Sequence, residues 1–144
     1  MGAPFSDLQQ LLQALEPELH EGVFTFALLP LGSDAAALDP IATVREAEGI
    51  TVVVAEAVAR EHGLAALFRA ARITLRVPSG LNAVGLTAAF AGALAQAGIS
   101  CNVVAGACHD HLFVPVERAA QAMAVLRALQ RNAWPRHTGD HHGR

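Results

Sequence analysis

The sequence predicts an α+β fold of two tandem ferredoxin-like βαββαβ units, with antiparallel sheets and helices on one face. Three observations lead to this expectation. The 144-residue chain is long enough for a compact core but too short for a multidomain enzyme. It is 53% hydrophobic and 16% charged, which is typical of a globular chain. Short apolar strands also alternate with helical patterns along the sequence.

The first half is predicted to contain, in order, a helix over 7–15, a strand over 23–29, a loop over 30–40, strands over 42–47 and 50–55, and a helix over 56–62. Ser6 and Gln9 form a capping-box pattern that marks the start of the first helix. Glu48-Gly49 is a turn signal between the second and third strands, and Gly63 is placed to end the second helix.

The second half is predicted to contain a strand over 72–77, a helix over 86–97, strands over 99–105 and 109–116, and a helix over 117–131. Leu86, Phe90 and Leu94 recur at helical spacing, and Gly98 follows where a left-handed residue would end the helix. This order is a ferredoxin-like unit without its last strand. We therefore expect interlocked halves that exchange strands, with units over 1–70 and 71–134 and a disordered tail over 135–144.

The strands over 23–29, 50–55 and 99–105 are apolar on both alternating faces. In a ferredoxin-like unit the helices cover one face of the sheet, so the other face needs a partner. A homo-oligomer is therefore expected.

Residues 73–90 (ITLRVPSGLNAVGLTAAF) and 94–106 (LAQAGISCNVVAG) resemble an ACT domain. Residues 42–51 (ATVREAEGIT) and 102–116 (NVVAGACHDHLFVPV) are similar to small bacterial two-ACT proteins of uncharacterised function. More distantly, the chain resembles the ACT units of aspartate kinases and the cytosolic arginine sensor. The resemblance implies a non-enzymatic regulatory module that binds an amino acid. Ala107-Cys108 stands where the family pattern leads us to expect an aromatic pair.

The loop over 79–85 is the main candidate site, because it opens a helix whose first backbone N–H groups attract an anion such as an α-carboxylate. Gly80 and Gly85 permit close backbone approach. The alternative is structural: Ser79 or Asn82 caps the helix, and Gly85 allows close packing of the helix on the sheet.

His109, Asp110 and His111 fall on a predicted strand, so the two histidines share one face and Asp110 lies on the other. Asp110 could accept an ammonium or guanidinium group, and a histidine could bind a polar group of the ligand. The alternative is that these polar residues hydrogen-bond backbone near the strand end. The predicted ligand-binding residues are Ser79, Gly80, Leu81, Asn82, Val84, Gly85, Asn102, His109, Asp110 and His111.

Other functions are disfavoured by the pattern. Two histidines supply only half of a zinc site and no Cys-x-x-Cys is present, so no metal and no cofactor are expected. Nucleophile elbows, phosphate loops and paired carboxylates in an apolar setting are missing from the sequence, so no enzymatic activity is expected. The net charge of −3 and the absence of strand aromatics with basic flanks argue against nucleic acid.

The uncharged stretch over 77–108 is long enough to span a membrane but is interrupted by Pro78, Gly80, Asn82 and Gly98, so no membrane span is expected. The N-terminus resembles no signal peptide, which predicts a cytoplasmic protein with reduced Cys101 and Cys108. The function expected is binding of a small-molecule ligand, an amino acid, by a regulatory protein. The alternative is a ligand-independent interaction or oligomerisation module that regulates a metabolic partner.

Overall fold

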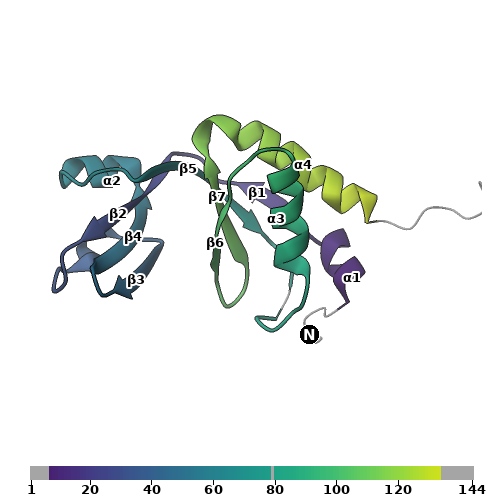
Figure 1. Cartoon of the computed structure of the whole chain (residues 1–144), viewed down its shortest axis with the longest axis horizontal. Coiled ribbons are helices and arrows are strands. Elements are labelled where there is room, and N and C mark those ends of the chain that lie inside the picture. Colours follow the sequence, from purple (N-terminus) through teal and green to yellow (C-terminus); the bar gives the residue numbers. More distant parts are fainter. Residues whose placement is uncertain (1–6, 79, 134–144) are drawn as a thin grey trace, which may run out of the picture.

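The computed structural model describes residues 7–78 and 80–133 and shows an elongated molecule with two lobes (Figure 1). All strands belong to one antiparallel sheet in the order β3-β4-β2-β5-β7-β6, with β1 also paired to β5. The strands are β1 (Pro17–Leu19), β2 (Phe24–Leu29), β3 (Ala42–Glu46), β4 (Gly49–Ala55), β5 (Phe68–Leu75), β6 (Asn102–Ala105) and β7 (Asp110–Pro115). The helices are α1 (Leu8–Gln13), α2 (Glu56–Glu61), α3 (Leu86–Gln96) and α4 (Ala119–Asn132), with 3₁₀ turns η1 (Ala35–Leu38) and η2 (Val116–Arg118).

The first unit consists of β2, β3, β4, α2 and the start of β5. Its strands lie in the order β3-β4-β2-β5, which is the order of a ferredoxin-like unit. The position of its first helix is occupied by η1 alone, within the stretch that the sequence predicts as a loop.

The second unit consists of β5, α3, β6, β7 and α4, and its fourth strand is β1. Pro17 pairs with Leu75 and Leu19 pairs with Ile73, so a segment from the chain's beginning closes the sheet. Exchange of a missing edge strand between the two halves is therefore confirmed. The three residues of β1 themselves were not predicted as a strand.

The strand β5 is shared between the two units. Ala70 pairs with Phe24 of β2, and three residues later Ile73 pairs with Leu19 of β1. The sequence predicts this strand over 72–77, whereas it begins at Phe68 and ends at Leu75. The boundary expected at residues 70 and 71 lies inside this strand.

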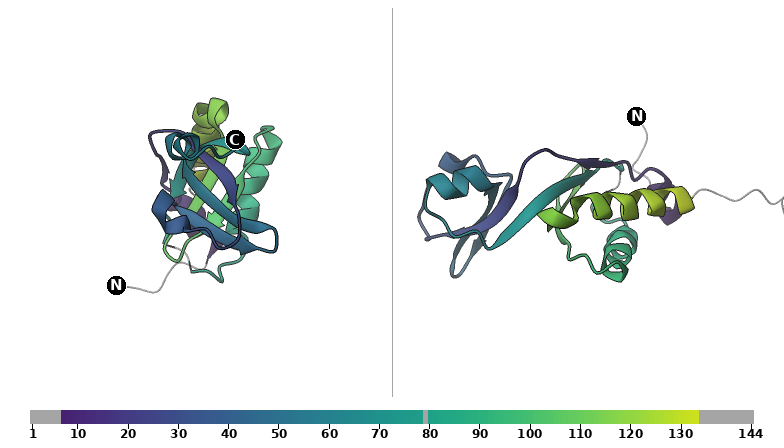
Figure 2. Two further views of the ribbon diagram at one scale, coloured as in Figure 1. Left: turned by 90° about the vertical axis from the view of Figure 1, so that its left-hand side faces the viewer. Right: turned by 90° about the horizontal axis from the view of Figure 1, so that it is seen from above.

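The helices cover one face of the sheet, as predicted. In the second unit, α1, α3 and α4 pack over Ile73 and Leu75 of β5 and Leu112 of β7, and α4 runs along the sheet (Figure 2). In the first unit, α2 and η1 pack over Ala27 and Val52. The helices thus enclose a separate core in each lobe.

The opposite side of the sheet, which no helix covers, is called the open face below. Where the units meet it is closed by an aromatic cluster of Phe24, Phe26, Phe68 and Phe113, in which Phe26 and Phe113 pack edge to face with ring centroids 5.5 Å apart. Phe113 is fully buried there without any helix above it. The centre of the face expected to need a partner is therefore covered by the chain's own side chains.

The helix ends show which cap predictions hold. Gly63 and Gly98 adopt the left-handed conformation at the ends of α2 and α3, as predicted. The cap of α1 is Asp7 rather than Ser6, because Asp7 Oδ1 accepts a hydrogen bond from the Gln9 amide at 2.7 Å.

Three other predicted elements differ at their boundaries. The strand predicted over 99–105 begins at Asn102, because the Ile99 amide donates a hydrogen bond to the Leu94 carbonyl at 2.9 Å and so belongs to the end of α3. The strand predicted over 109–116 spans Asp110–Pro115, and the last predicted helix begins with η2. The tail expected over 135–144 lies outside the described residues.

Candidate functional site

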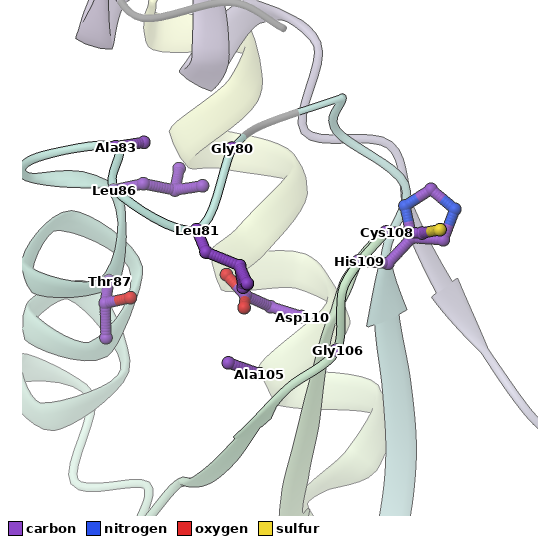
Figure 3. A pocket seen from close by; sticks show the side chains of 10 residues that line it. All are labelled: Gly80, Leu81, Ala83, Leu86, Thr87, Ala105, Gly106, Cys108, His109 and Asp110. Atoms are coloured by element: carbon purple, nitrogen blue, oxygen red, sulfur yellow. The ribbon is translucent and has the colours of Figure 1, made fainter.

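A hollow of about 80 Å³ lies between the loop before α3 and the turn that joins β6 to β7 (Figure 3). At about 30 Å³ for each water molecule, it has room for roughly two or three, which is comparable to the head group of an amino acid. The residues that line it are Gly80, Leu81, Ala83, Leu86, Thr87, Ala105, Gly106, Cys108, His109 and Asp110.

One wall of the hollow is the first turn of α3. The N-cap residue is Gly85 in the left-handed region at φ 94°, and no side chain of the described residues caps the helix. Asn82 lies three residues before this cap, so the alternative in which Asn82 caps the helix is wrong. The amides of Leu86 and Thr87 have no partner within the helix, and both residues line the hollow.

The glycine at the cap is explained by its backbone conformation. A Cβ on Gly85 would meet the Leu8 side chain at 3.4 Å, with no sheet atom among its nearest neighbours. Close packing of the helix on the sheet is therefore not the reason for this glycine. Its positive φ is, because side chains disfavour that region.

The opposite wall is the tight turn between β6 and β7. The Gly106 amide donates to the His109 carbonyl at 2.9 Å. A Cβ on Gly106 would lie 2.9 Å from that carbonyl oxygen, so only glycine fits without displacement. The turn places Asp110 at the first position of β7.

The Asp110 carboxylate points toward Leu81 and the loop before α3, whereas the ring of His109 points away from them (Figure 3). This is the alternation predicted for the two residues. Burial raises the pKa of Asp110, and the nearby His109 opposes part of that effect. Asp110 makes no salt bridge among the described residues, although its carboxylate borders the hollow.

Four of the ten predicted residues line the hollow: Gly80, Leu81, His109 and Asp110. Asn82 and Val84 are exposed beside it, and Gly85 supports it as the cap. Ser79 lies outside the described residues.

Asn102 and His111 are on the open face, away from the hollow. Asn102 is paired with Phe113, and His111 with Thr74. They therefore lie on the other side of the sheet from Asp110. The lining residues that sequence reasoning missed are Ala83, Leu86, Thr87, Ala105, Gly106 and Cys108. Of these, only Cys108 could have been found from the sequence, because it directly precedes His109.

The two thiols have different surroundings. Cys108 is exposed at the hollow, whereas burial raises the pKa of Cys101 to about 11. Both are free cysteines. Within residues 7–78 and 80–133, no three His, Cys, Asp or Glu side chains are grouped so as to hold a metal ion. Over the same residues, no helix is long and apolar enough to cross a membrane.

Comparison with known proteins identifies the family. One ACT domain family model matches residues 3–71 and a second matches residues 69–128. No curated protein matches the chain. Among solved structures, a Vibrio cholerae protein of unknown function, described as a possible transport protein, is 47% identical with a TM-score of 0.78. That match covers 85% of this chain and 95% of the other.

Two further structures share the fold at low identity. A protein from Agrobacterium tumefaciens is 15% identical with a TM-score of 0.66, covering 79% of this chain and 87% of its own. The regulatory subunit of aspartate kinase from Thermus flavus is 13% identical with a TM-score of 0.57, covering 81% of this chain and 98% of its own. The two matched ranges, the strand order of both units and the 47% identical relative agree, and the chain belongs to the ACT-domain family with two ACT units.

Proposed function

We propose that this protein is a non-enzymatic, cytoplasmic regulatory module whose second ACT unit binds a free amino acid in the hollow at the start of α3. ACT domains are regulatory ligand-binding modules in general, which supports the class of function. One observation carries the finer assignment: within residues 7–78 and 80–133, a carboxylate without an ion-pair partner and a helix start without a side-chain cap line the same small hollow.

The two walls have complementary chemistry for a zwitterion. The free amides of Leu86 and Thr87 favour an α-carboxylate by about 0.3 to 1 kcal/mol, and by up to about 2 kcal/mol where the contact is partly buried. A charged hydrogen bond from an ammonium or guanidinium group to Asp110 adds about 1.5 to 3 kcal/mol. Together these contributions amount to about 2 to 5 kcal/mol, which corresponds to dissociation constants from tens of millimolar down to roughly a few tenths of a millimolar.

Calorimetry with each of the twenty amino acids tests the proposal. We expect heat with at least one, and loss of that heat in Asp110→Asn and in Thr87→Trp, in which the indole fills the hollow. Ala88→Trp is the matched control, because Ala88 is the next residue of the same helical turn, is exposed and does not line the hollow. Gly85 is a poor target, since a side chain at φ 94° strains the cap itself.

A ligand-independent interaction module is the second candidate, and the exposed apolar side chains on the open face of the first unit favour it. Leu28 and Val44 are 44% and 56% exposed there. If no amino acid gives heat and the three variants respond alike, amino-acid binding is excluded and this second function takes its place. In either case we propose that the protein is a homo-oligomer joined through that surface.

A further inference from the structure

The open face of the second unit carries a compact polar cluster that the proposed amino-acid site does not use. Thr74 on β5 is fully buried at its centre and pairs directly with His111 of β7 and Glu18 of β1. Arg72 precedes Thr74 on the same face of β5. His20 follows β1, and its amide donates to the Arg72 carbonyl at 2.9 Å.

A chain of hydrogen bonds links these side chains. His20 Nε2 lies 2.7 Å from Thr74 Oγ1, and Thr74 Oγ1 lies 3.0 Å from His111 Nδ1. Arg72 Nη2 donates to the same His111 Nδ1 at 3.4 Å. Because a guanidinium can only donate, His111 Nδ1 is the acceptor and the ring proton is on Nε2.

One donor of the cluster, Arg72 Nε, has no acceptor among the described residues. Among the described residues, the buried side-chain nitrogen and oxygen atoms without a hydrogen-bond partner are Arg72 Nε and His109 Nδ1, and both residues belong to this end of the sheet. The one carboxylate in reach, Glu18, is held by Arg76, whose Nε donates to it at 2.6 Å. Arg72 therefore makes no ion pair in the described part of the chain.

The electrostatics of the cluster favour an anion. Burial and the nearby Arg72 lower the pKa of His20, and the same two causes lower the pKa of His111, to which Arg76, His109 and His20 also contribute. The groups facing His111 are thus cationic or neutral on β5 and β7, and Glu18 on β1 is already paired. A negative charge placed here would relieve this repulsion.

We propose that Arg72, His111 and His20 form a second ligand site, which binds the oxyanion of a small molecule, a carboxylate or a phosphate group, through the Arg72 guanidinium. Guanidinium groups match the geometry of carboxylate and phosphate, which favours Arg72 as the main donor. The site is separate from the hollow at α3, because Asp110 points to the other side of the sheet (Figure 3). It also does not depend on the proposed function, since a protein that binds no amino acid still presents these donors.

Histidine NMR resonances of the full chain, titrated with sulfate, phosphate and succinate against chloride at equal ionic strength, test this site. Sulfate, whose charge is constant near neutral pH, should shift the ring signals of His20 and His111 and should bind several-fold more tightly as the pH falls below about 6.5. The phosphate and succinate arms distinguish the source of the oxyanion.

In Arg72→Gln the sulfate dissociation constant should rise at least tenfold. Arg69→Gln is the matched control, because it removes one guanidinium from the same strand on the helix-covered face and should leave binding unchanged. Arg72→Lys, which keeps the charge but not the fork, should be intermediate and replaces Arg72→Gln if that variant does not fold. Equal shifts with chloride, equal binding in both glutamine variants, or shifts confined to residues around the α3 hollow would each overturn the proposal.

Discussion

The charge of Asp110 has opposite effects on fold stability and on the proposed ligand binding. Its pKa is raised by burial, so the folded state favours the protonated form. A group whose folded pKa is raised stabilises the fold only at low pH, and that contribution is lost as the pH rises through the folded value. At neutral pH the half-buried negative charge of Asp110 therefore lowers the free energy of unfolding. A cationic group of a ligand beside it would reduce that loss.

Asp110→Asn should for this reason raise the melting temperature at neutral pH while weakening ligand binding about ten- to a hundredfold, as expected for loss of a charged hydrogen bond. The gain should shrink as the pH falls toward about 4, where the wild-type side chain is also uncharged. Thermal unfolding at several pH values with parallel calorimetry measures both effects. A lower melting temperature at neutral pH would instead assign Asp110 a structural role.

The cysteines provide an internal reporter of the hollow. The pKa of Cys101 is about 11 instead of 9.0, which leaves roughly a hundredfold less thiolate than an ordinary thiol. Iodoacetamide at neutral pH should therefore modify the exposed Cys108 and leave Cys101 intact, as judged by mass spectrometry of peptides. An amino acid bound in the hollow should slow alkylation of Cys108. Unchanged alkylation at saturating ligand would place the bound molecule elsewhere.

The period of a strand allowed part of the site to be predicted. Asp110 and His109 point to different sides because successive side chains alternate, and this much follows from sequence alone. The same alternation places Asn102 and His111 on the open face, but only the pairing register shows it, since Asn102 lies opposite Phe113. Thr87 and Ala105 could not be predicted, because small residues acquire a role only when two distant segments meet.

At the scale of elements, the strands with apolar patterns were predicted and β1 was not. Pro17, Glu18 and Leu19 are too few to make an alternating pattern recognisable, and Glu18 and Leu19 are both exposed. What makes them a strand is the unpaired edge of β5 beside them. The early start of β5 at Phe68 was not predicted either. It includes the exposed Arg69, whose ion pair with Glu56 of α2 forms only in the folded chain.

The completion of the second unit by the chain's beginning is a testable consequence. Leu11 and Leu15 are fully buried in its core, and Gln130 Nε2 at the end of α4 donates to the Gln13 carbonyl at 2.7 Å. Residues 68–133 alone should therefore be unfolded. The same fragment with residues 7–22 joined after residue 133 by a short Gly-Ser linker should fold, because β1 then follows α4 as the fourth strand follows the second helix in an uninterrupted ferredoxin-like unit.

Circular dichroism and amide NMR dispersion measure the difference between the two fragments. The matched control is the joined fragment carrying Leu15→Asp, which buries a charge in the core and should not fold. Cooperative unfolding of residues 68–133 without the added segment would show that β1 is dispensable.

At the scale of the whole molecule, the open face changes character from one lobe to the other. In the second unit it is polar, around Arg72 and Thr74. In the first unit, Leu28 and Val44 lie on either side of Thr51 in one row across β2, β4 and β3, and both are largely exposed. The aromatic cluster closes the centre of the face but stops short of this row. The row is therefore the apolar surface left for a second copy of the chain.

Val44→Glu should then convert a dimer into a monomer of about half the mass in sedimentation velocity at micromolar concentration. A charge buried without a partner costs several kcal/mol, enough to raise the dimer dissociation constant about a hundredfold or more. Leu31→Glu is the matched control, because Leu31 has the same 56% exposure but lies in the loop after β2, outside this row. Since Val44 lies on the outermost strand and is exposed, the substitution should leave the melting temperature of the monomer nearly unchanged. A monomeric wild-type protein, or dissociation by both substitutions alike, would exclude this face as the interface.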